Sequence, residues 1–440
     1  MLARLDLRSA VTGGPLPESP RQLAALLPRP RVDGAEPVAA VREILAAVRR
    51  RGDEALRELT ARFDGVVVDE VRVPASEVKD ALERIPDSLR DALETAAANI
   101  EAYHRTQLHP PTDHEALGVR VRSLAVPVER AGCYVPGGRA RYPSTVLMTA
   151  VVAKVAGVPE VALVTPPGPD GAVPLVTLAA AAVAGVDEVY RVGGAQAVAA
   201  LAYGTKSIAP VDVLVGPGNA YVAIAKREVA QEGLVGVPSA FAGPSEVVVV
   251  ADATADPSHA AIDVIVQAEH GPDGLAWLIA WDHTVLDAVD DEIERLVAAN
   301  PRRSEIEATF SGGGRAVLVD DAVSAVAVSN AIAPEHLELM VADPESLLPL
   351  VRHAGAVFTG AWSPASLGDY VAGPSHVLPT FGTARFGEAL TVADFQKHVH
   401  VVSASEDGLR TLGPHVMTLA EEEGLPAHAQ SVGLRLGRRA

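Results

Sequence analysis

The run Ala333-Pro334-Glu335-His336-Leu337 places a carboxylate and an imidazole next to each other in the chain. Adjacent acid and base groups are what an enzyme that moves protons requires. An ordinary helix start after a proline would give the same run, with the glutamate near a favourable helix N-terminus, and for these residues alone that explanation is the better one. A catalytic role becomes the better explanation when further polar side chains are considered, namely Gln267, His270, Asp369, His376, Glu423 and His428.

Several of these side chains are of types that bind Zn²⁺. Gln267 and His270 stand three residues apart in an expected helix, so they project from one face and can share an ion. One glutamine oxygen, one carboxylate and two imidazoles would make a mixed set of oxygen and nitrogen ligands that suits Zn²⁺ and leaves room for a substrate. Taken singly, such residues are more often exposed polar side chains. The residue types therefore offer a metal site and a base, provided that they converge.

Glycine-rich turns follow three of the expected strands. They are Tyr134 to Gly138, Gly193-Gly194-Ala195-Gln196 and Gly216-Pro217-Gly218-Asn219. Glycine permits close approach of a ligand to the backbone, and N–H groups that open a helix suit a pyrophosphate. No GxGxxG run follows an expected strand, although an α/β sheet can bind a nucleotide at its switch point through other turns. Any one turn could need glycine only for its backbone angles, so the stronger signal is that three lie at the same edge.

Cys133 is the only cysteine in the chain. No disulfide can form within the chain, and zinc sites built from several thiolates are excluded. Nothing near Cys133 in the sequence would lower its pKa, so we expect a small buried residue before a turn rather than a nucleophile. The first residues also lack the apolar core of a secretory signal. These features predict a cytoplasmic protein.

The composition is that of a large globular protein. The chain has 440 residues, of which 48% are apolar and 21% charged, and this length predicts about two to four folded domains. The net charge of −19 argues against nucleic acid or an anionic membrane as a partner, because binding a polyanion needs a basic surface. The most apolar stretch, 145–164, is interrupted by Lys154, Pro159 and Glu160, so no membrane span is expected.

Periodicity predicts an α/β protein with two Rossmann-like, doubly wound domains, because helices and strands alternate from 144 to 215 and again from 245 to 359. The expected domains are a small N-terminal arm, a nucleotide-binding domain and a helical C-terminal tail, at residues 1–35, 134–245 and 391–440. Residues 36–133 and 246–390 would together form the domain that carries the metal ligands and the acid/base pair. Within it, 37–64 and 76–108 are expected to be helices and 119–128 a strand.

Taken in order, several motifs resemble those of the histidinol dehydrogenase family. They are YVPGG, GGAQAVAALAYGT, VGPGN, AGPSE, QAEHGP, APEHLEL, GDYVAGPSHVLPT and EGLPAH, and the similarity extends from about Val38 to Arg435. It implies an NAD-dependent, zinc-containing dehydrogenase of histidine biosynthesis, which oxidises L-histidinol to L-histidine through bound L-histidinal with two NAD⁺. The first thirty residues match poorly, and VAGPS precedes His376 where many relatives carry Asn, but neither difference touches a proposed ligand or base.

The resemblance also implies a role for each candidate residue. Glu335 and His336 would be the acid/base pair, and one Zn²⁺ per subunit would be bound by Gln267, His270, Asp369 and His428. NAD would lie against Tyr134, Gln196 and Asn219 in the glycine-rich turns. Substrate contacts would come from Ser245, Gln267, His270, His336, Asp369, His376, Glu423 and His428. The family forms homodimers in which the tail reaches across, so Glu423 and His428 would complete the partner's site.

The implied chemistry has two oxidation steps. His336 would take the alcohol proton as a hydride leaves for NAD, while Zn²⁺ would hold the imidazole and amino groups of histidinol. Glu335 would then activate water to hydrate the bound aldehyde, and His336 would accept a second proton as a second NAD takes a hydride.

Two other classes of function fit parts of the sequence. A metal-dependent hydrolase would use the same Gln, His, Asp and His set to activate water, and formation of NADH from histidinol would exclude it. A non-enzymatic ligand-binding protein with two α/β lobes would keep its function in Glu335→Gln and His336→Asn variants.

Overall fold

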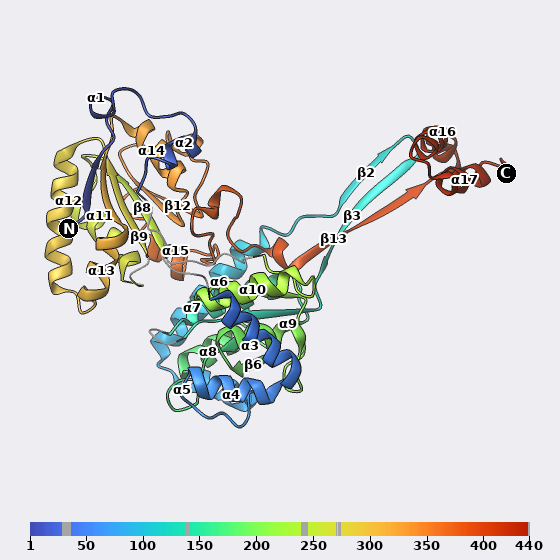
Figure 1. Ribbon diagram of the computed structural model, residues 1–440, viewed down its shortest axis with the longest axis horizontal. Helices are drawn as coiled ribbons and strands as arrows, with labels where there is room; N and C mark the ends of the chain where they lie inside the picture. Colours follow the sequence, from blue (N-terminus) through green and yellow to red (C-terminus); the bar gives the residue numbers. More distant parts are fainter. Residues whose placement is uncertain (29–36, 138–140, 239–244, 270, 272–273, 439–440) are drawn as a thin grey trace.

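The computed structural model describes residues 1–28, 37–137, 141–238, 245–269, 271 and 274–438. Two parallel sheets form two lobes, and an antiparallel arm projects from the body (Figure 1). The six-stranded sheet has the order β1 (Ala3–Asp6), β10 (Gly314–Leu318), β9 (Leu275–Ala280), β8 (Glu246–Ala251), β11 (His336–Met340) and β12 (Ala356–Thr359). The four-stranded sheet has the order β6 (Glu188–Arg191), β5 (Glu160–Thr165), β4 (Arg130–Tyr134) and β7 (Val213–Val215).

The six-stranded sheet is covered by helices on both faces. Its strand β8 is buried along its whole length, as a central strand of a parallel sheet must be, and this explains its run of valines. Val247 and Val249 pack on one face with helices α11 (Pro257–Ala268), α12 (His283–Ala299) and α13 (Arg303–Gly313). Val248 and Val250 pack on the other face with α14 (Ala322–Ile332) and α2 (Pro20–Ala24).

The four-stranded sheet is likewise sandwiched between helices. One face is covered by α5 (Ala75–Arg84), α6 (Asp87–Arg105), α7 (Pro143–Val155) and α8 (Leu175–Val183). The other is covered by α3 (Val38–Arg51), α4 (Asp53–Phe63), α9 (Gly194–Tyr203) and α10 (Ala220–Gln231). Most of the apolar side chains are Ala, Val and Leu, as the low aromatic content of 4% requires.

This arrangement differs from the predicted domain boundaries. Residues 36–133 were expected to join 246–390, yet α3 to α6 and β4 build the lobe of the four-stranded sheet. Residues 1–35 were expected to form an arm, yet β1 is an edge strand of the six-stranded sheet and α2 packs on α14. An amphipathic helix shows that one face is buried, but its sequence does not tell which sheet it covers.

The projecting arm consists of β2 (Thr112–Ala116), β3 (Val119–Pro127) and β13 (Gln396–Ala404), with α16 (Glu406–Glu422) and α17 (Pro426–Arg435) at its tip (Figure 1). Leu117 and Gly118 join β2 to β3, and both have positive φ, at 53° and 72°, as a tight hairpin turn requires. The strand predicted at 119–128 is confirmed. The predicted tail is α-helical only from residue 406, because 396–404 pair with β3.

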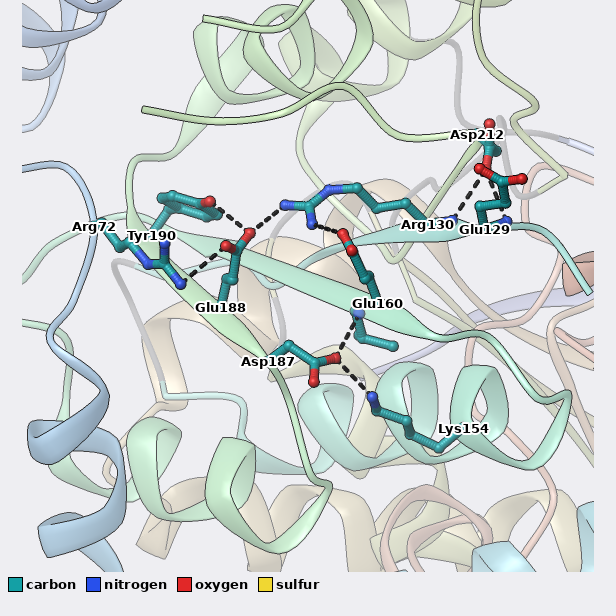
Figure 2. A network of polar contacts seen from close by, with 10 residues as sticks. Arg72, Glu129, Arg130, Lys154, Glu160, Asp187, Glu188, Tyr190 and Asp212 are labelled. Carbon is teal, nitrogen blue, oxygen red and sulfur yellow. Dashed lines mark hydrogen bonds and ion pairs between the residues drawn. The ribbon is translucent and has the colours of Figure 1, made fainter. Parts of the chain in front are cut away.

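The amino edge of the four-stranded sheet is closed by charged side chains (Figure 2). Arg130 of β4 forms ion pairs with Glu160 and Glu188, which begin β5 and β6. Arg72 also reaches Glu188, at 2.9 Å, and Asp212 accepts backbone N–H bonds from Glu129 and Arg130. The ion pairs therefore occupy one end of these strands, and the glycine-rich turns lie at the other.

The remaining elements are short. They are helices α1 (Ser9–Thr12) and α15 (Ala365–Tyr370) and the 3₁₀ helices η1 (Leu348–Leu350), η2 (Thr383–Arg385) and η3 (Val392–Phe395). Among the described residues, no helix has both the length and the apolar character needed to cross a membrane.

Candidate active site

A cavity of about 1250 Å³ lies at the carboxyl edge of the four-stranded sheet. Tyr134 ends β4, Gln196 lies in the first turn of α9, and Asn219 caps α10, and all three line the cavity. The strand order reverses between β4 and β7, and such a switch point is where open α/β sheets bind nucleotides. The structure therefore brings together the three residues predicted to bind a nucleotide.

Glycine allows the turns around this cavity to approach one another. Gly216 has a φ of 101°, and a Cβ atom there would lie 2.1 Å from the carbonyl oxygen of Tyr134. The backbone N–H of Gly194 donates to the Tyr134 hydroxyl at 3.0 Å. Burial raises the pKa of Tyr134 to about 12, so its hydroxyl stays neutral and can still donate a hydrogen bond to a ligand.

A fully buried lysine supports the third glycine-rich turn. The ammonium of Lys226, on α10, donates to the carbonyl oxygen of Gly216. Burial lowers the pKa of Lys226 to about 7. Its sequence position gives no sign of this role, because a lysine near the middle of an amphipathic helix is usually exposed.

The acid/base pair lies at the amino edge of the six-stranded sheet. Helix α14 ends at Ile332, Ala333 adopts the left-handed conformation with a φ of 53°, and β11 begins at His336. The alternative of a helix start after Pro334 is therefore wrong, since the pair leads into a strand. This position also departs from the rule that sites in open α/β sheets lie at the carboxyl ends of strands.

Backbone atoms of β8 hold the pair in place. Glu335 Oε2 accepts from the N–H of Glu246 at 3.0 Å and lies 3.5 Å from His336 Nδ1. The same ring nitrogen lies 3.2 Å from the carbonyl oxygen of Glu246. Ser245, predicted to contact substrate, directly precedes Glu246, and its carbonyl oxygen accepts from Leu275 N–H at 3.1 Å. The structure thus places Ser245 at the same edge of the sheet.

Two predicted metal ligands meet His336 from the opposite side. His336 Nε2 lies 3.2 Å from Asp369 Oδ1, and Gln267 Nε2 donates to Asp369 Oδ2 at 3.4 Å. Gln267 and Asp369 are the second-last residues of α11 and α15, so both helices return the chain to the amino edge of the sheet. The ring of Phe358 stacks on His336, with ring centroids 5.9 Å apart.

His376 links this cluster to the other lobe. Its Nδ1 lies 2.8 Å from the carbonyl oxygen of Asp369, and its Nε2 lies 3.2 Å from Thr145 Oγ1 on α7. Nearby, Ser375 Oγ donates to the carbonyl oxygen of Met148 at 3.0 Å. The amino edge of one sheet therefore faces the lobe of the other, and the predicted catalytic residues lie between them.

Burial and charge oppose each other at the histidines. Burial lowers the pKa of His336, but the Glu335 and Asp369 carboxylates outweigh it and hold that pKa well above its usual value. At His376 burial prevails and the pKa is lowered. Behind the site, Asp263 and Glu338 form a second buried pair, in which burial raises both pKa values and mutual repulsion adds to the rise at Glu338.

The predicted zinc ligands are only partly assembled within one chain. Gln267 is buried, and its Oε1 atom has no hydrogen-bond partner, although a buried polar atom normally has one. This oxygen and the adjacent Asp369 carboxylate suit a divalent cation. His270 lies outside the described residues. Within the described part of the chain, no three His, Cys, Asp or Glu side chains are grouped to hold a metal ion.

Glu423 and His428 lie far from the other predicted residues. Both are exposed, at the end of α16 and on α17, at the tip of the projecting arm (Figure 1). The structure of one chain therefore does not bring them to His336.

Three supporting residues were not identified from the sequence. They are Glu246, whose backbone holds the acid/base pair, Thr145, which contacts His376, and Phe358, which stacks on His336. The motif AGPSE includes Glu246, but Glu246 holds the pair through its backbone N–H and C=O groups. Other residue types have the same groups, so the sequence does not reveal this role. The scarcity of aromatic residues, at 4%, is the only sequence signal that draws attention to Phe358.

Comparison with known proteins gives consistent matches over nearly the whole chain. The family model for histidinol dehydrogenase matches residues 27–436. A histidinol dehydrogenase of Synechococcus sp. is 50% identical over 404 residues, which cover 90% of this chain and 92% of the relative. One of Pseudomonas aeruginosa is 49% identical over 400 residues, covering 90% of each. The crystal structure of histidinol dehydrogenase from Elizabethkingia anophelis superposes with a TM-score of 0.92 at 33% identity, covering 99% of this chain and 98% of that one.

Proposed function

The chain belongs to the histidinol dehydrogenase family, and on that premise we propose how its residues carry out the reaction. It is an NAD-dependent oxidoreductase that oxidises L-histidinol to L-histidine, the final steps of histidine biosynthesis. The matches do not support the metal-dependent hydrolase considered as the alternative.

NAD binds in the cavity at the carboxyl edge of the four-stranded sheet. The support is that Tyr134, Gln196 and Asn219 converge there from three separate turns. The N-termini of α9 and α10 point N–H groups into this region, which favours the pyrophosphate. In this position the nicotinamide ring can extend towards His336 in the other lobe.

His336 is the general base for both oxidations. Its Nδ1 lies against the Glu246 carbonyl oxygen, so Nε2 is the nitrogen directed towards Asp369 and the space between the lobes. The alcohol oxygen gives its proton to His336 in its neutral form as the carbon that bears this oxygen gives a hydride to NAD. The Glu335 and Asp369 carboxylates, which raise the pKa of His336, stabilise the imidazolium that forms. Glu335 Oε2 is held by the Glu246 N–H, which leaves Oε1 to orient and deprotonate the water that hydrates the aldehyde.

One Zn²⁺ per subunit would be held by Gln267, His270, Asp369 and His428 of the partner subunit. The support within this chain is the unpartnered Gln267 Oε1 beside the Asp369 carboxylate. When bound, the metal fixes the imidazole and amino groups of the substrate. Ser245, His376 and Glu423 of the partner subunit would complete the substrate pocket, together with the metal ligands and His336.

A homodimer with exchanged tails is the arrangement that completes this site. The arm exposes apolar side chains on its outer strand β13, including Val402 at 66% exposure and Val399 at 44%, and on its central strand β3, at Val121 and Leu124. Such residues are normally covered when several lie together. The cytoplasm is the compartment that suits the single buried thiol, Cys133.

The observation that carries these assignments is the contact chain from Glu335 through His336 and Asp369 to Gln267, placed between the lobes. Metal analysis paired with an NAD-reduction assay on histidinol tests it. Gln267→Leu should lose bound zinc, whereas His336→Asn should keep zinc and lose turnover by about 10²- to 10⁴-fold. Gln231→Leu, at an exposed position of α10, should change neither. Full turnover in His336→Asn, or normal zinc content in Gln267→Leu, would contradict the assigned roles.

A further inference from the structure

The wall of the NAD cavity contains the carboxylate of Asp64, which takes no part in the proposed reaction. Asp64 follows the last residue of α4 and lines the cavity together with Tyr134 and Gln196. Its Oδ2 atom is buried and has no hydrogen-bond partner. Leaving a carboxylate oxygen buried and unpaired is costly. A ligand that donates a hydrogen bond at this place would remove that cost.

The other carboxylates of the cavity differ from Asp64 in this respect. Glu77 forms an ion pair with Arg191 at 3.8 Å, and Asp170 accepts from the N–H of Ala172 at 3.0 Å. Among the described carboxylates that line the cavity, Asp64 is thus the one with a buried oxygen left for a ligand. Burial also raises the pKa of Asp64 to about 6, so at neutral pH its charge is still largely present.

The position of Asp64 fits the adenosine half of NAD. The nicotinamide ring must reach His336 in the lobe of the six-stranded sheet, so the adenosine half extends the other way from the helix N-termini at Gly194 and Asn219. Figure 1 shows α4, which Asp64 follows, on the side of its lobe remote from the six-stranded sheet. Phe63, next to Asp64, also lines the cavity and is 51% exposed, and an aromatic ring of this kind can pack against a base.

We propose that Asp64 accepts a hydrogen bond from the 2′-hydroxyl of the adenosine ribose and thereby makes the enzyme select NAD over NADP. A carboxylate in this role pairs with the hydroxyl of NAD and repels the 2′-phosphate of NADP. The same function is served by an acidic residue in common dinucleotide folds, where it lies beyond a GxGxxG turn that this chain lacks. Here the residue comes instead from the end of a helix that precedes the sheet in sequence. Arg84 and Arg141 also line the cavity and supply positive charge for the pyrophosphate.

Steady-state kinetics of the full-length enzyme with histidinol, comparing NAD and NADP, test the proposal. Asp64→Ser should raise the KM for NAD by roughly tenfold or more, as expected for loss of a hydrogen bond to a charged group, with little change in kcat. Asp64→Asn, which keeps the size of the side chain and removes its charge, should lower the ratio of kcat/KM for NAD to that for NADP by a similar factor. Glu70→Ser removes an equal charge from an exposed position of the same loop and should leave both values unchanged.

A second measurement does not depend on the variants folding. Wild-type enzyme should show a KM for 2′-deoxyadenosine NAD that is roughly tenfold higher than for NAD. Equal KM values for the two dinucleotides would overturn the proposal, as would unchanged cofactor selectivity in folded Asp64→Asn.

The proposal rests on the placement of NAD in this cavity, and the two can fail separately. Asn219→Ala should raise the KM for NAD without changing the preference for NAD over NADP. If Asn219→Ala has no effect, the placement of NAD is wrong. If Asn219→Ala acts and the Asp64 variants do not, only the role of Asp64 is wrong.

Discussion

At Glu335, the two carboxylate oxygens have different surroundings. Oε2 accepts from the Glu246 N–H and lies near the His336 ring, whereas Oε1 has no such contact in the structure. A glutamine can keep the hydrogen bond to Glu246 but cannot take a proton from water. Glu335→Gln therefore separates the two roles of this side chain, because it keeps the hydrogen bond that positions the side chain and removes the base.

We expect Glu335→Gln to retain the first oxidation and to slow the second by about 10²- to 10⁴-fold, the usual contribution of a general base. The measurement is the number of NADH formed per histidinol in a single turnover, which should fall from two towards one while the aldehyde accumulates. Glu345→Gln, at an exposed position, serves as the matched control. Equal slowing of both oxidations would show that Glu335 does not act on water alone.

At this scale, the sequence predicted residue types well and contacts poorly. Glu335, His336, Asp369 and Gln267 were identified as candidates and lie together in the structure. The backbone support from Glu246 and the Thr145 contact to His376 depend on how separate elements meet, and no residue pattern encodes that. A helix start after Pro334 was an incorrect alternative for Glu335 and His336, because a proline can precede a strand as well as a helix.

Among the elements, α10 and the turn before it depend on the buried Lys226. Its pKa is lowered from 10.5 to about 7 by burial. Between these pH values the unfolded chain holds a proton that the folded chain lacks, so the free energy of unfolding rises with pH, by at most about 1.4 kcal/mol per pH unit. Below pH 7 both states are protonated, and the folded state bears the full cost of the buried charge. Cys133, the nearby thiol, stays neutral over this range because burial raises its pKa to about 12.

Lys226→Met keeps most of the side-chain volume and removes the titrating group. We expect the free energy of unfolding of wild type to rise from pH 7 to pH 9 by about 1–3 kcal/mol more than that of the variant. Urea denaturation at three pH values measures this difference. Lys206→Met, at an exposed lysine, should follow the wild-type curve. Parallel curves for wild type and Lys226→Met would mean that the lysine is not buried with a lowered pKa.

The junction between the arm and α16 depends on Gly118. Its φ is 72°, and a Cβ atom would lie 2.7 Å from Ser405 Oγ and 2.8 Å from Gly408 Cα. Its carbonyl oxygen also accepts from the N–H of Ser405 at 2.9 Å. The hairpin turn and the first turn of α16 are therefore in direct contact, and no larger residue fits between them.

We expect Gly118→Val to displace α16 and α17 and to lower kcat by tenfold or more, since a β-branched residue is strained at positive φ and would clash here. The thermal unfolding of the body should change little, because the turn lies outside both lobes. Gly14→Val, in open space with ordinary φ, is the control. Normal activity in Gly118→Val would show that the position of α16 does not matter for catalysis.

Regular alternation made the central elements predictable from the sequence. The alternating segments predicted at 144–215 and 245–359 contain strands β5 to β7 and β8 to β12, with helices between them. The elements that were not predicted include β1, β2, α10, α13 and β13. Strands β1 and β13 pair with partners about 270 to 310 residues away in sequence, so their local patterns carry little information. Helices α3 to α6 were assigned to the wrong lobe, because their sequences show a buried face but not which sheet it covers.

For the whole molecule, the position of Glu423 and His428 at the tip of the arm has a direct functional consequence. In a single chain, two of the residues proposed for the site lie at the tip of the arm, and the proposed homodimer would cover the exposed apolar residues of the arm. Isologous dimers allow each chain to donate the same segment to the other.

We expect heterodimers of a His336→Asn chain and a His428→Asn chain to recover about half of the wild-type activity, although both homodimers are inactive. With exchanged tails, one site combines the two intact histidines and the other combines both substitutions. Coexpression with two affinity tags and sequential purification yields the heterodimer, and a doubly tagged wild-type dimer sets the reference. An inactive heterodimer would show that each tail serves its own chain.

The pairing of β1 with β10 affects how the chain is made. On the ribosome, residues 3–6 emerge before their partner strand at 314–318, which appears roughly 15 to 60 s later at the usual speed of about 5–20 residues per second. The lobe of the four-stranded sheet, built mainly from residues 38–231, can close during this interval. The leading strand must meanwhile remain unpaired, so nascent chains stalled before residue 314 should expose it to chaperones and proteases.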